Sequence, residues 1–132
     1  MSVFKNEILS QEYLYDFAVD GGAVSTIVLS DKVGYKALPA GALVTNVYAV
    51  VETACTSGGS ATVSWGNADV DGYSGTAKAV AALVGDAAFA GDGALVPSVV
   101  SDGDFSVAIA VAALTAGKVR FTVEYVMQGR DA

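Results

Sequence analysis

Hydrophobic and polar positions alternate most regularly near the C-terminus, from residue 104 to residue 128. Large apolar and small residues alternate from Phe105 to Ala112, and apolar and polar residues alternate after Gly117. Successive side chains of a strand point to opposite faces, so this period predicts β-strands. We expect a β-hairpin closed by Leu114–Gly117, whose glycine can adopt positive φ. The second arm has the apolar face Val119, Phe121, Val123, Tyr125 and Met127, and the polar face Lys118, Arg120, Thr122, Glu124 and Gln128.

The first arm of this predicted hairpin has no polar face. No charged residue occurs from Phe105 to Gly117. A strand without a polar face is typically covered on both sides. The core of the fold would supply one cover. Either residues 76–90 of the same chain or another chain would supply the second.

Other strand candidates precede this region, at residues 13–19, 24–30, 43–56, 61–65 and 94–101, of which residues 43–56 are the longest. Residues 43–56 are long for one strand, so a bend or bulge is expected there. Pro97 restricts its segment to a sheet edge or a bulge. The alternation is lost between Gly66 and Gly93, where residues 76–84 favour two helical turns because alanine is a good helix former.

This pattern predicts an all-β protein. We expect a jelly-roll-like two-sheet β-sandwich of about seven to eight strands, formed by residues 13–132 as a single domain. An immunoglobulin-like sandwich is disfavoured because the Cys–Trp–Cys spacing is absent. Residues 1–12 lack a period of two and are interpreted as an N-terminal arm.

Composition narrows the classes of function. The chain has 132 residues, of which 53% are hydrophobic and 16% charged, against about 25% charged residues in typical domains. So little charge favours assembly into an oligomer, although the high alanine and glycine content alone would give similar figures. The net charge of −7 argues against a nucleic-acid partner, because phosphate binding needs clustered Lys and Arg.

The N-terminal sequence lacks the apolar stretch of a secretory signal, and the uncharged run is shorter than the roughly 20 residues that span a bilayer. We therefore expect a protein made in the cytoplasm with no membrane partner. Its single cysteine, Cys55, is interpreted as a buried apolar residue.

Catalytic and metal-binding motifs are weak. The sequence contains no histidine, which excludes a Ser-His-Asp triad and a His-ligated metal. Asp69, Asp71 and Gly72 resemble the start of a calcium loop, but Lys78 stands where its glutamate is expected. An acidic turn is the favoured interpretation. No spacing singles out a catalytic pair among the 14 acidic residues, so we expect no enzyme activity, cofactor or metal.

Five aromatic residues suggest a second possibility, a platform on which sugars stack. Packing in the core or in an interface is favoured, because strand alternation already explains the first three. The five are Tyr13, Tyr15, Phe17, Tyr48 and Trp65.

Three segments in order resemble small virion structural proteins of tailed bacteriophages, in particular head decoration (cement) proteins. They are Leu38-Pro-Ala-Gly-Ala-Leu-Val-Thr-Asn-Val-Tyr, Thr56-Ser-Gly-Gly-Ser-Ala-Thr-Val-Ser-Trp-Gly, and Ala113-Leu-Thr-Ala-Gly-Lys-Val-Arg-Phe-Thr-Val-Glu-Tyr. The resemblance covers roughly residues 38–127 and consists of turns and strands, without active-site residues. It implies a jelly-roll-like sandwich, often a homotrimer, that clamps the major capsid protein on the virion surface.

Two other functions remain open from the residues alone. One is a receptor- or glycan-binding module of a tail or fibre, and a more distant one is a hydrolase. For the capsid function, the arm offers partner-binding residues, because Val3, Phe4, Ile8 and Leu9 are apolar but precede the first alternating strand. We expect this arm to dock on a neighbouring subunit or on the capsid.

Overall fold

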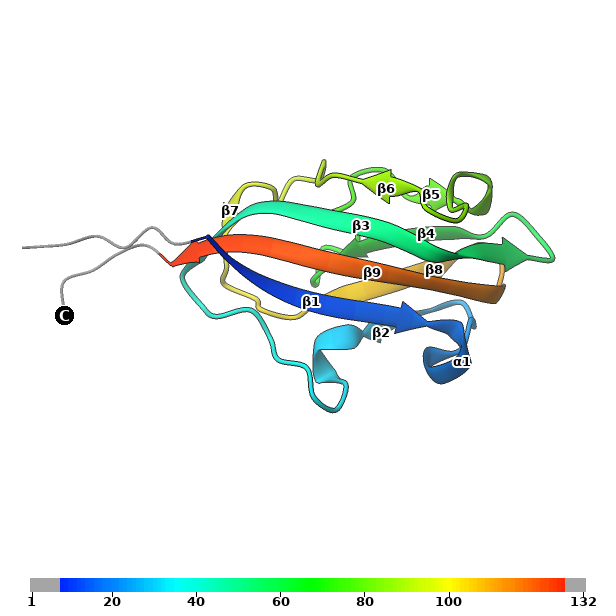
Figure 1. The fold of residues 1–132 in the computed structure, drawn as a ribbon, viewed down its shortest axis with the longest axis horizontal. Helices are drawn as coiled ribbons and strands as arrows, with labels where there is room; N and C mark the ends of the chain where they lie inside the picture. The colour runs from blue at the N-terminus through cyan, green and yellow to red at the C-terminus, as the bar shows by residue number, and fades with distance from the viewer. Residues whose placement is uncertain (1–7, 128–132) are drawn as a thin grey trace, which may run out of the picture.

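The computed structural model describes residues 8–127, which form two antiparallel sheets that pack against each other (Figure 1). Sheet A has the order β1 (Ile8–Asp16), β9 (Leu114–Met127), β3 (Ala42–Ser57) and β6 (Ala88–Phe89), and β7 (Ser98–Val99) also pairs with β3. Sheet B has the order β2 (Ser25–Val28), β8 (Ser106–Ala110), β4 (Thr62–Gly66) and β5 (Lys78–Ala79). Three short helical turns connect them: α1 (Phe17–Asp20), η1 (Leu29–Asp31) and η2 (Val80–Ala82).

The predicted all-β, two-sheet, single-domain fold is confirmed. The described part of the chain contains nine strands, and the three beyond the principal six are only two residues long. The inner face of β9 is as predicted, because Val119, Phe121, Val123 and Tyr125 are all buried.

The predicted hairpin of residues 104–128 is wrong. Strand β8 pairs with β2 and β4 in sheet B, whereas β9 pairs with β1 and β3 in sheet A. Residues 114–117 are not a turn but the first residues of β9, where Leu114 pairs with Ser57. The chain instead crosses between the sheets just before Leu114. Alternation reveals which side chains face the core, but not which strands pair. Two strands in facing sheets show the same alternation as two strands paired in one sheet.

The second face of β8 is made of small residues. Val107 and Ile109 are buried in the core, while Ala108 is half-buried and Ala110 is exposed. Residues 76–90 do not supply the expected cover: β5 extends sheet B beside β4, and β6 extends sheet A beside β3. This segment closes one side of the sandwich. Residues 76–84 form β5 and a 3-10 turn, so the predicted helical turns are also wrong.

Strand β1 begins earlier and ends earlier than predicted. Residues 8–12, assigned to the arm from the sequence, pair with β9 without interruption. The alternation is blurred there because Gln11 occupies an inward position, where its amide reaches the carbonyl oxygen of Lys36. The strand ends at Asp16, which caps α1 by accepting a hydrogen bond from the backbone of Ala18.

Bulges and irregularities bend β3, as its length predicted. The register between β3 and β9 shifts at four places, and the first two shifts skip Thr45 and Glu52. An extra residue exchanges the two faces of a strand. The buried positions therefore shift from Ala42 and Val44 before the first bulge to odd-numbered residues after it. Leu43 consequently lies on the outer face, whereas Val47 lies on the inner face.

Aromatic rings from both sheets form the centre of the core. Phe105, which immediately precedes β8, stacks on Tyr13 with the ring centroids 4.7 Å apart and on Tyr73 at 5.6 Å. Trp65 of β4 lies 5.2 Å from Phe121 of β9. These contacts hold the two sheets together and leave the outer face of sheet A free for other contacts.

Candidate partner-binding surface

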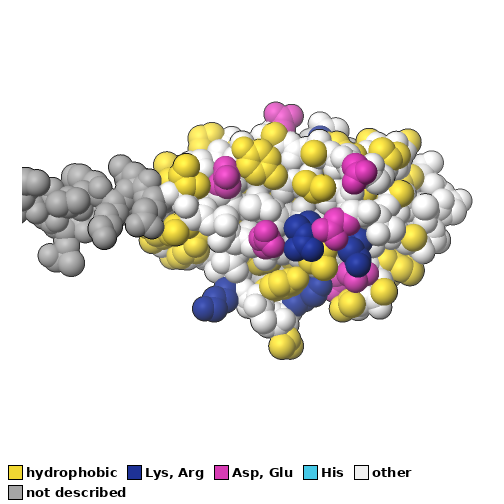
Figure 2. Space-filling view, in the orientation of Figure 1, with side chains coloured by type: hydrophobic (Ala, Val, Ile, Leu, Met, Phe, Trp, Pro, Cys, Tyr) yellow, Lys and Arg dark blue, Asp and Glu magenta, His cyan; other side chains and the backbone are white. Residues whose placement is uncertain are grey.

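Four apolar side chains form a row across one end of sheet A. The register aligns Ile8 of β1, Val126 of β9, Leu43 of β3 and Val99 of β7. Directly paired residues place their side chains on the same face of a sheet. Ile8 is 70% exposed and Val99 56%, while the two residues between them are half-buried. Figure 2 shows apolar side chains gathered at this end of the molecule. We call these four residues the apolar row.

The predicted partner-binding residues divide between different environments. Ile8 belongs to the apolar row and is free to contact a partner. Leu9 points to the other face of the sheet, where it is half-buried against the core cluster. Val3 and Phe4 lie outside the described residues. The structure therefore favours Ile8 over Leu9 as a contact residue.

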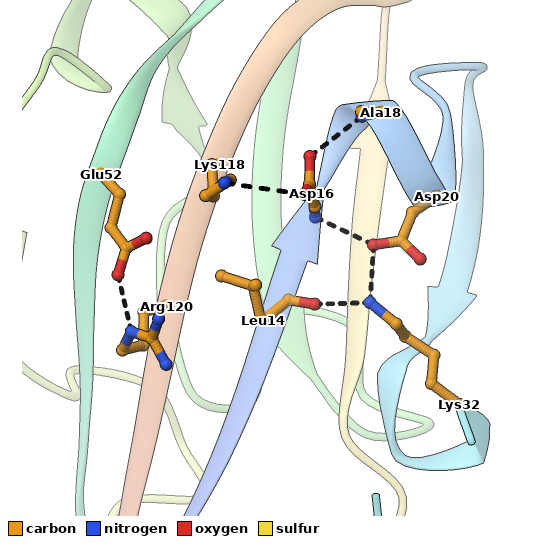
Figure 3. Close-up of polar contacts among 8 residues, drawn as sticks. All are labelled: Leu14, Asp16, Ala18, Asp20, Lys32, Glu52, Lys118 and Arg120. Carbon is orange, nitrogen blue, oxygen red and sulfur yellow. Dashed lines mark hydrogen bonds and ion pairs between the residues drawn. The ribbon is translucent and has the colours of Figure 1, made fainter. Parts of the chain in front are cut away.

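The centre of the same face is charged. Arg120 of β9 donates a 2.6 Å hydrogen bond from Nε to Glu52 of β3 and one of 3.2 Å from a terminal nitrogen to Glu12 of β1. The hydrogen bond and charge of Glu52 raise the pKa of Arg120 above its ordinary value. Lys118 lies 3.7 Å from Asp16, and Figure 3 shows this pair beside the contact with Glu52. Exposed ion pairs add about 0–1 kcal/mol to stability. These charges therefore contribute little to folding and chiefly make the centre of this face polar.

A second polar group lies at the free edge of β1. Lys32 forms a 3.0 Å ion pair with Asp20 and donates a 2.8 Å hydrogen bond to the carbonyl oxygen of Leu14. Asp20 also accepts a 2.9 Å hydrogen bond from the backbone N–H of Asp16 (Figure 3). The aspartate is nearly buried, with 6% of its side chain exposed. These contacts fix the loop after η1 against the edge strand.

The acidic turn does not assemble a metal site among the residues described. Asp69 and Asp71 contact each other, and their shared hydrogen bond raises the pKa of Asp69. No group of three potential ligands occurs between residues 8 and 127. Cys55 is buried, as expected, and burial raises the pKa of its thiol, so it remains protonated and weakly nucleophilic at neutral pH.

The five aromatic residues do not form a sugar-binding platform. Tyr13, Tyr15 and Trp65 are buried in the core, and burial raises the pKa of both tyrosines. Their hydroxyl groups donate 2.6 Å hydrogen bonds to backbone carbonyl oxygens. Tyr48 lies on the outer face of sheet A and is 39% exposed. The packing interpretation of the buried three is therefore confirmed.

The apolar row is not visible in the sequence, because its members come from four strands. Each of the four is an ordinary apolar residue in its own segment, and only the register brings them together. The first bulge of β3 is essential, because it separates Leu43 from the buried residues that follow. No local pattern in the sequence encodes that alignment.

No helix in the described part of the chain is long and apolar enough to cross a membrane.

Comparisons with known proteins identify the fold but no family. No protein-family model matches the sequence, and no curated protein matches it. Among solved structures, a chain of the cyanophage Pam1 capsid asymmetric unit is similar with a TM-score of 0.66 and 18% identity, covering 92% of this chain and 86% of that one. A chain of the acid-stable capsid of Helicobacter pylori bacteriophage KHP30 gives a TM-score of 0.65 and 15% identity, covering 96% and 93%.

A third similar chain comes from the capsid of Ralstonia phage GP4, with a TM-score of 0.56 and 15% identity, covering 95% of this chain and 86% of that one. All three similarities extend over nearly the whole length of both chains. The chain thus has a fold that occurs in bacteriophage capsids.

Proposed function

We propose that this protein is a structural component of a bacteriophage virion that binds the outer surface of the major capsid protein lattice and stabilises it. The observation that carries the proposal is the similarity of fold to chains of three phage capsids, which covers at least 92% of this chain and 86% of each of the others. Burial of Tyr13, Tyr15 and Trp65 removes the main support for the glycan-binding alternative. The acidic net charge of −7 suits a protein on the outside of the shell better than one in contact with packaged DNA.

The apolar row is the proposed contact with the shell. Ile8 and Val99 are exposed at its two ends, and side chains of this type are favourable to bury in an interface. Residues 1–7 of the predicted arm directly precede Ile8 in the chain. We propose that Val3 and Phe4 continue this contact, so that the apolar row and the arm bind the capsid together.

We further propose that the protein is a homotrimer. The outer face of β8 supports this, because it carries no charge and is lined by small side chains. Three linked copies would bind a lattice far more tightly than one copy with the same weak contacts. The residues of this face are Thr26, Val28, Thr62, Ser64, Ser106, Ala108 and Ala110, of which Ser64 and Ser106 are buried within the chain itself and the other five are at least partly exposed.

The test is co-sedimentation with purified heads that lack this protein. The double variant Ile8→Asp/Val99→Asp places charges at both ends of the apolar row and should lose binding while remaining folded. Val19→Asp is the matched control, because Val19 is 72% exposed in α1, at the opposite end of β1. Deletion of residues 1–7 should also reduce binding. If the double variant and the deletion both decorate heads as fully as the unchanged protein, the proposed contact is wrong.

A further inference from the structure

The two edges of sheet A differ in how far other segments cover their backbone groups. On the β3 side, the segment before β7 covers the edge: the N–H of Val51 donates a 2.8 Å hydrogen bond to Ala87, and that of Cys55 a 2.9 Å bond to Leu83. The opposite edge is β1, a nine-residue strand that pairs only with β9 within the described residues. An uncovered edge strand presents unpaired backbone groups to any other extended chain.

Two contacts show which backbone groups of β1 point away from β9. The carbonyl oxygen of Leu14 accepts from Lys32, and the N–H of Asp16 donates to Asp20, both on the side of β1 opposite β9 (Figure 3). Antiparallel strands alternate between residues that direct both groups to the partner and residues that direct both away. The register of β1 with β9 is uninterrupted. The N–H and C=O groups of Ser10 and Glu12 therefore also point away from β9.

The edge is capped over one half and open over the other. Lys32 and Asp20 occupy the outward groups of Leu14 and Asp16. Within residues 8–127, the outward backbone groups of Ser10 and Glu12 have no such contact.

The segment between η1 and β3 runs past this edge, where the carbonyl oxygen of Lys36 accepts hydrogen bonds from the side chains of Gln11 and Tyr13. Its backbone is paired with the segment that precedes β8. Leu38 donates its N–H to Gly103, and Gly41 donates its N–H to Val100. It therefore does not pair with the open half of β1.

We infer that the open edge of β1, residues 8–12, accepts an extended segment of a partner polypeptide, which adds a strand to sheet A. Backbone hydrogen bonds to Ser10 and Glu12 would provide the affinity, and side chains at alternate positions the specificity. Inward side chains of the added strand would lie beside Leu9 and Gln11, both half-buried, and so favour apolar residues. Outward side chains would lie beside Glu12.

Charge defines the partner more closely. Arg120 is shared between Glu12 and Glu52, so this trio has a net negative charge. Glu124 adds a second negative charge on the same face, directly opposite Ser10. The segment that fits therefore carries Lys or Arg at its outward positions. A second copy of β1 fits poorly, because it would bring another Glu12 to the same face.

This inference deepens the proposed function by giving the chemistry of the partner, an extended basic and apolar segment of another virion protein. The test does not depend on the capsid. It uses a synthetic peptide of four Lys-Val repeats with blocked ends, followed by amide hydrogen exchange in the full-length protein. In the free protein, the amides of Ser10 and Glu12 should exchange rapidly, whereas those of Leu9 and Gln11 should be protected by β9.

Millimolar peptide should slow exchange at Ser10 and Glu12 several-fold and leave Leu9 and Gln11 unchanged. A Glu-Val peptide and a Lys-Val peptide methylated on alternate backbone nitrogens should have no effect.

Ser10→Pro removes an outward N–H without touching the β9 ladder and should abolish binding, whereas Ser10→Ala should retain it. Glu12→Lys changes the net charge of residues 12, 52, 120 and 124 from −2 to 0, so it should remove the preference between the two charged peptides.

Protection of Ser10 and Glu12 in the free protein would overturn the inference, because the edge would then be occupied by the chain itself. Equal binding of the methylated peptide, or no change at either amide at millimolar peptide, would also overturn it. Head binding by Ser10→Pro separates the two proposals. Loss of both peptide and head binding places the capsid contact at this edge, and retained head binding assigns the edge to a different partner.

Discussion

Strands β8 and β9 are neighbours in the chain and face the same core from opposite sides. Both bury apolar side chains at every second position: Val107 and Ile109 from β8, and Val119, Phe121 and Val123 from β9. Their outer faces differ, because β9 carries paired charges and β8 carries small uncharged residues. The inner faces thus determine stability, while the outer faces are available for different kinds of contact.

The largest expected effect is on the inner face of β9. Phe121→Ala should lower the free energy of unfolding by about 3–5 kcal/mol, because Phe121 is fully buried against Trp65 and Phe105. Thr122→Ala, one position along the strand and on the outer face, should change it by less than about 0.5 kcal/mol. Urea unfolding of the two variants measures the difference. Equal shifts in the unfolding midpoint would show that the two faces of β9 have been exchanged.

The next effect concerns the start of β9, where close packing requires a glycine. A Cβ on Gly117 would lie 2.6 Å from Sγ of Cys55, and its φ of 147° is unfavourable for other residues. Gly117→Ala should cost about 1–3 kcal/mol. If the contact with sulfur dominates, the cost should be smaller in a Cys55→Ala background, and a double-mutant cycle measures that coupling. A fully stable Gly117→Ala variant would contradict this packing.

A smaller effect is expected across the core in β4. Trp65 is buried, and its indole N–H has no hydrogen-bond partner among the described residues. A buried donor without a partner destabilises the fold. Trp65→Phe removes this donor, and the stability gained offsets part of the stability lost with the smaller side chain. Thermal unfolding should therefore show a much smaller loss than the roughly 3–5 kcal/mol expected for Trp65→Ala. Equal losses would indicate that the indole N–H is satisfied in solution.

The smallest effect on folding should come from the two outer faces. Ala110→Lys on β8 and Arg120→Ala on β9 should each change stability by less than about 1 kcal/mol. The two variants should differ in oligomeric state. If the small-residue face of β8 forms the trimer, light scattering should report monomers for Ala110→Lys and trimers for Arg120→Ala. Trimers from both variants would exclude this face as the contact.

The sequence predicted the fold class because alternation records burial directly. The same alternation could not assign β8 and β9 to sheets, because strands on opposite sides of a core share one pattern. The bulge at Thr45 shows a second limit: it moved Leu43 to the outer face and created the apolar row, and local sequence does not mark where a ladder skips a residue. Leu9 shows a third, because an apolar residue outside an obvious pattern can still be half-buried.

The most direct test of the central claim is electron cryomicroscopy of purified heads with and without the added protein. The account predicts extra density for a β-sandwich on the outer surface of the shell, with the end of sheet A that carries Ile8 and Val99 toward the major capsid protein. The density should disappear for Ile8→Asp/Val99→Asp. Heads without extra density at saturating protein, or density on the inner surface, would contradict it.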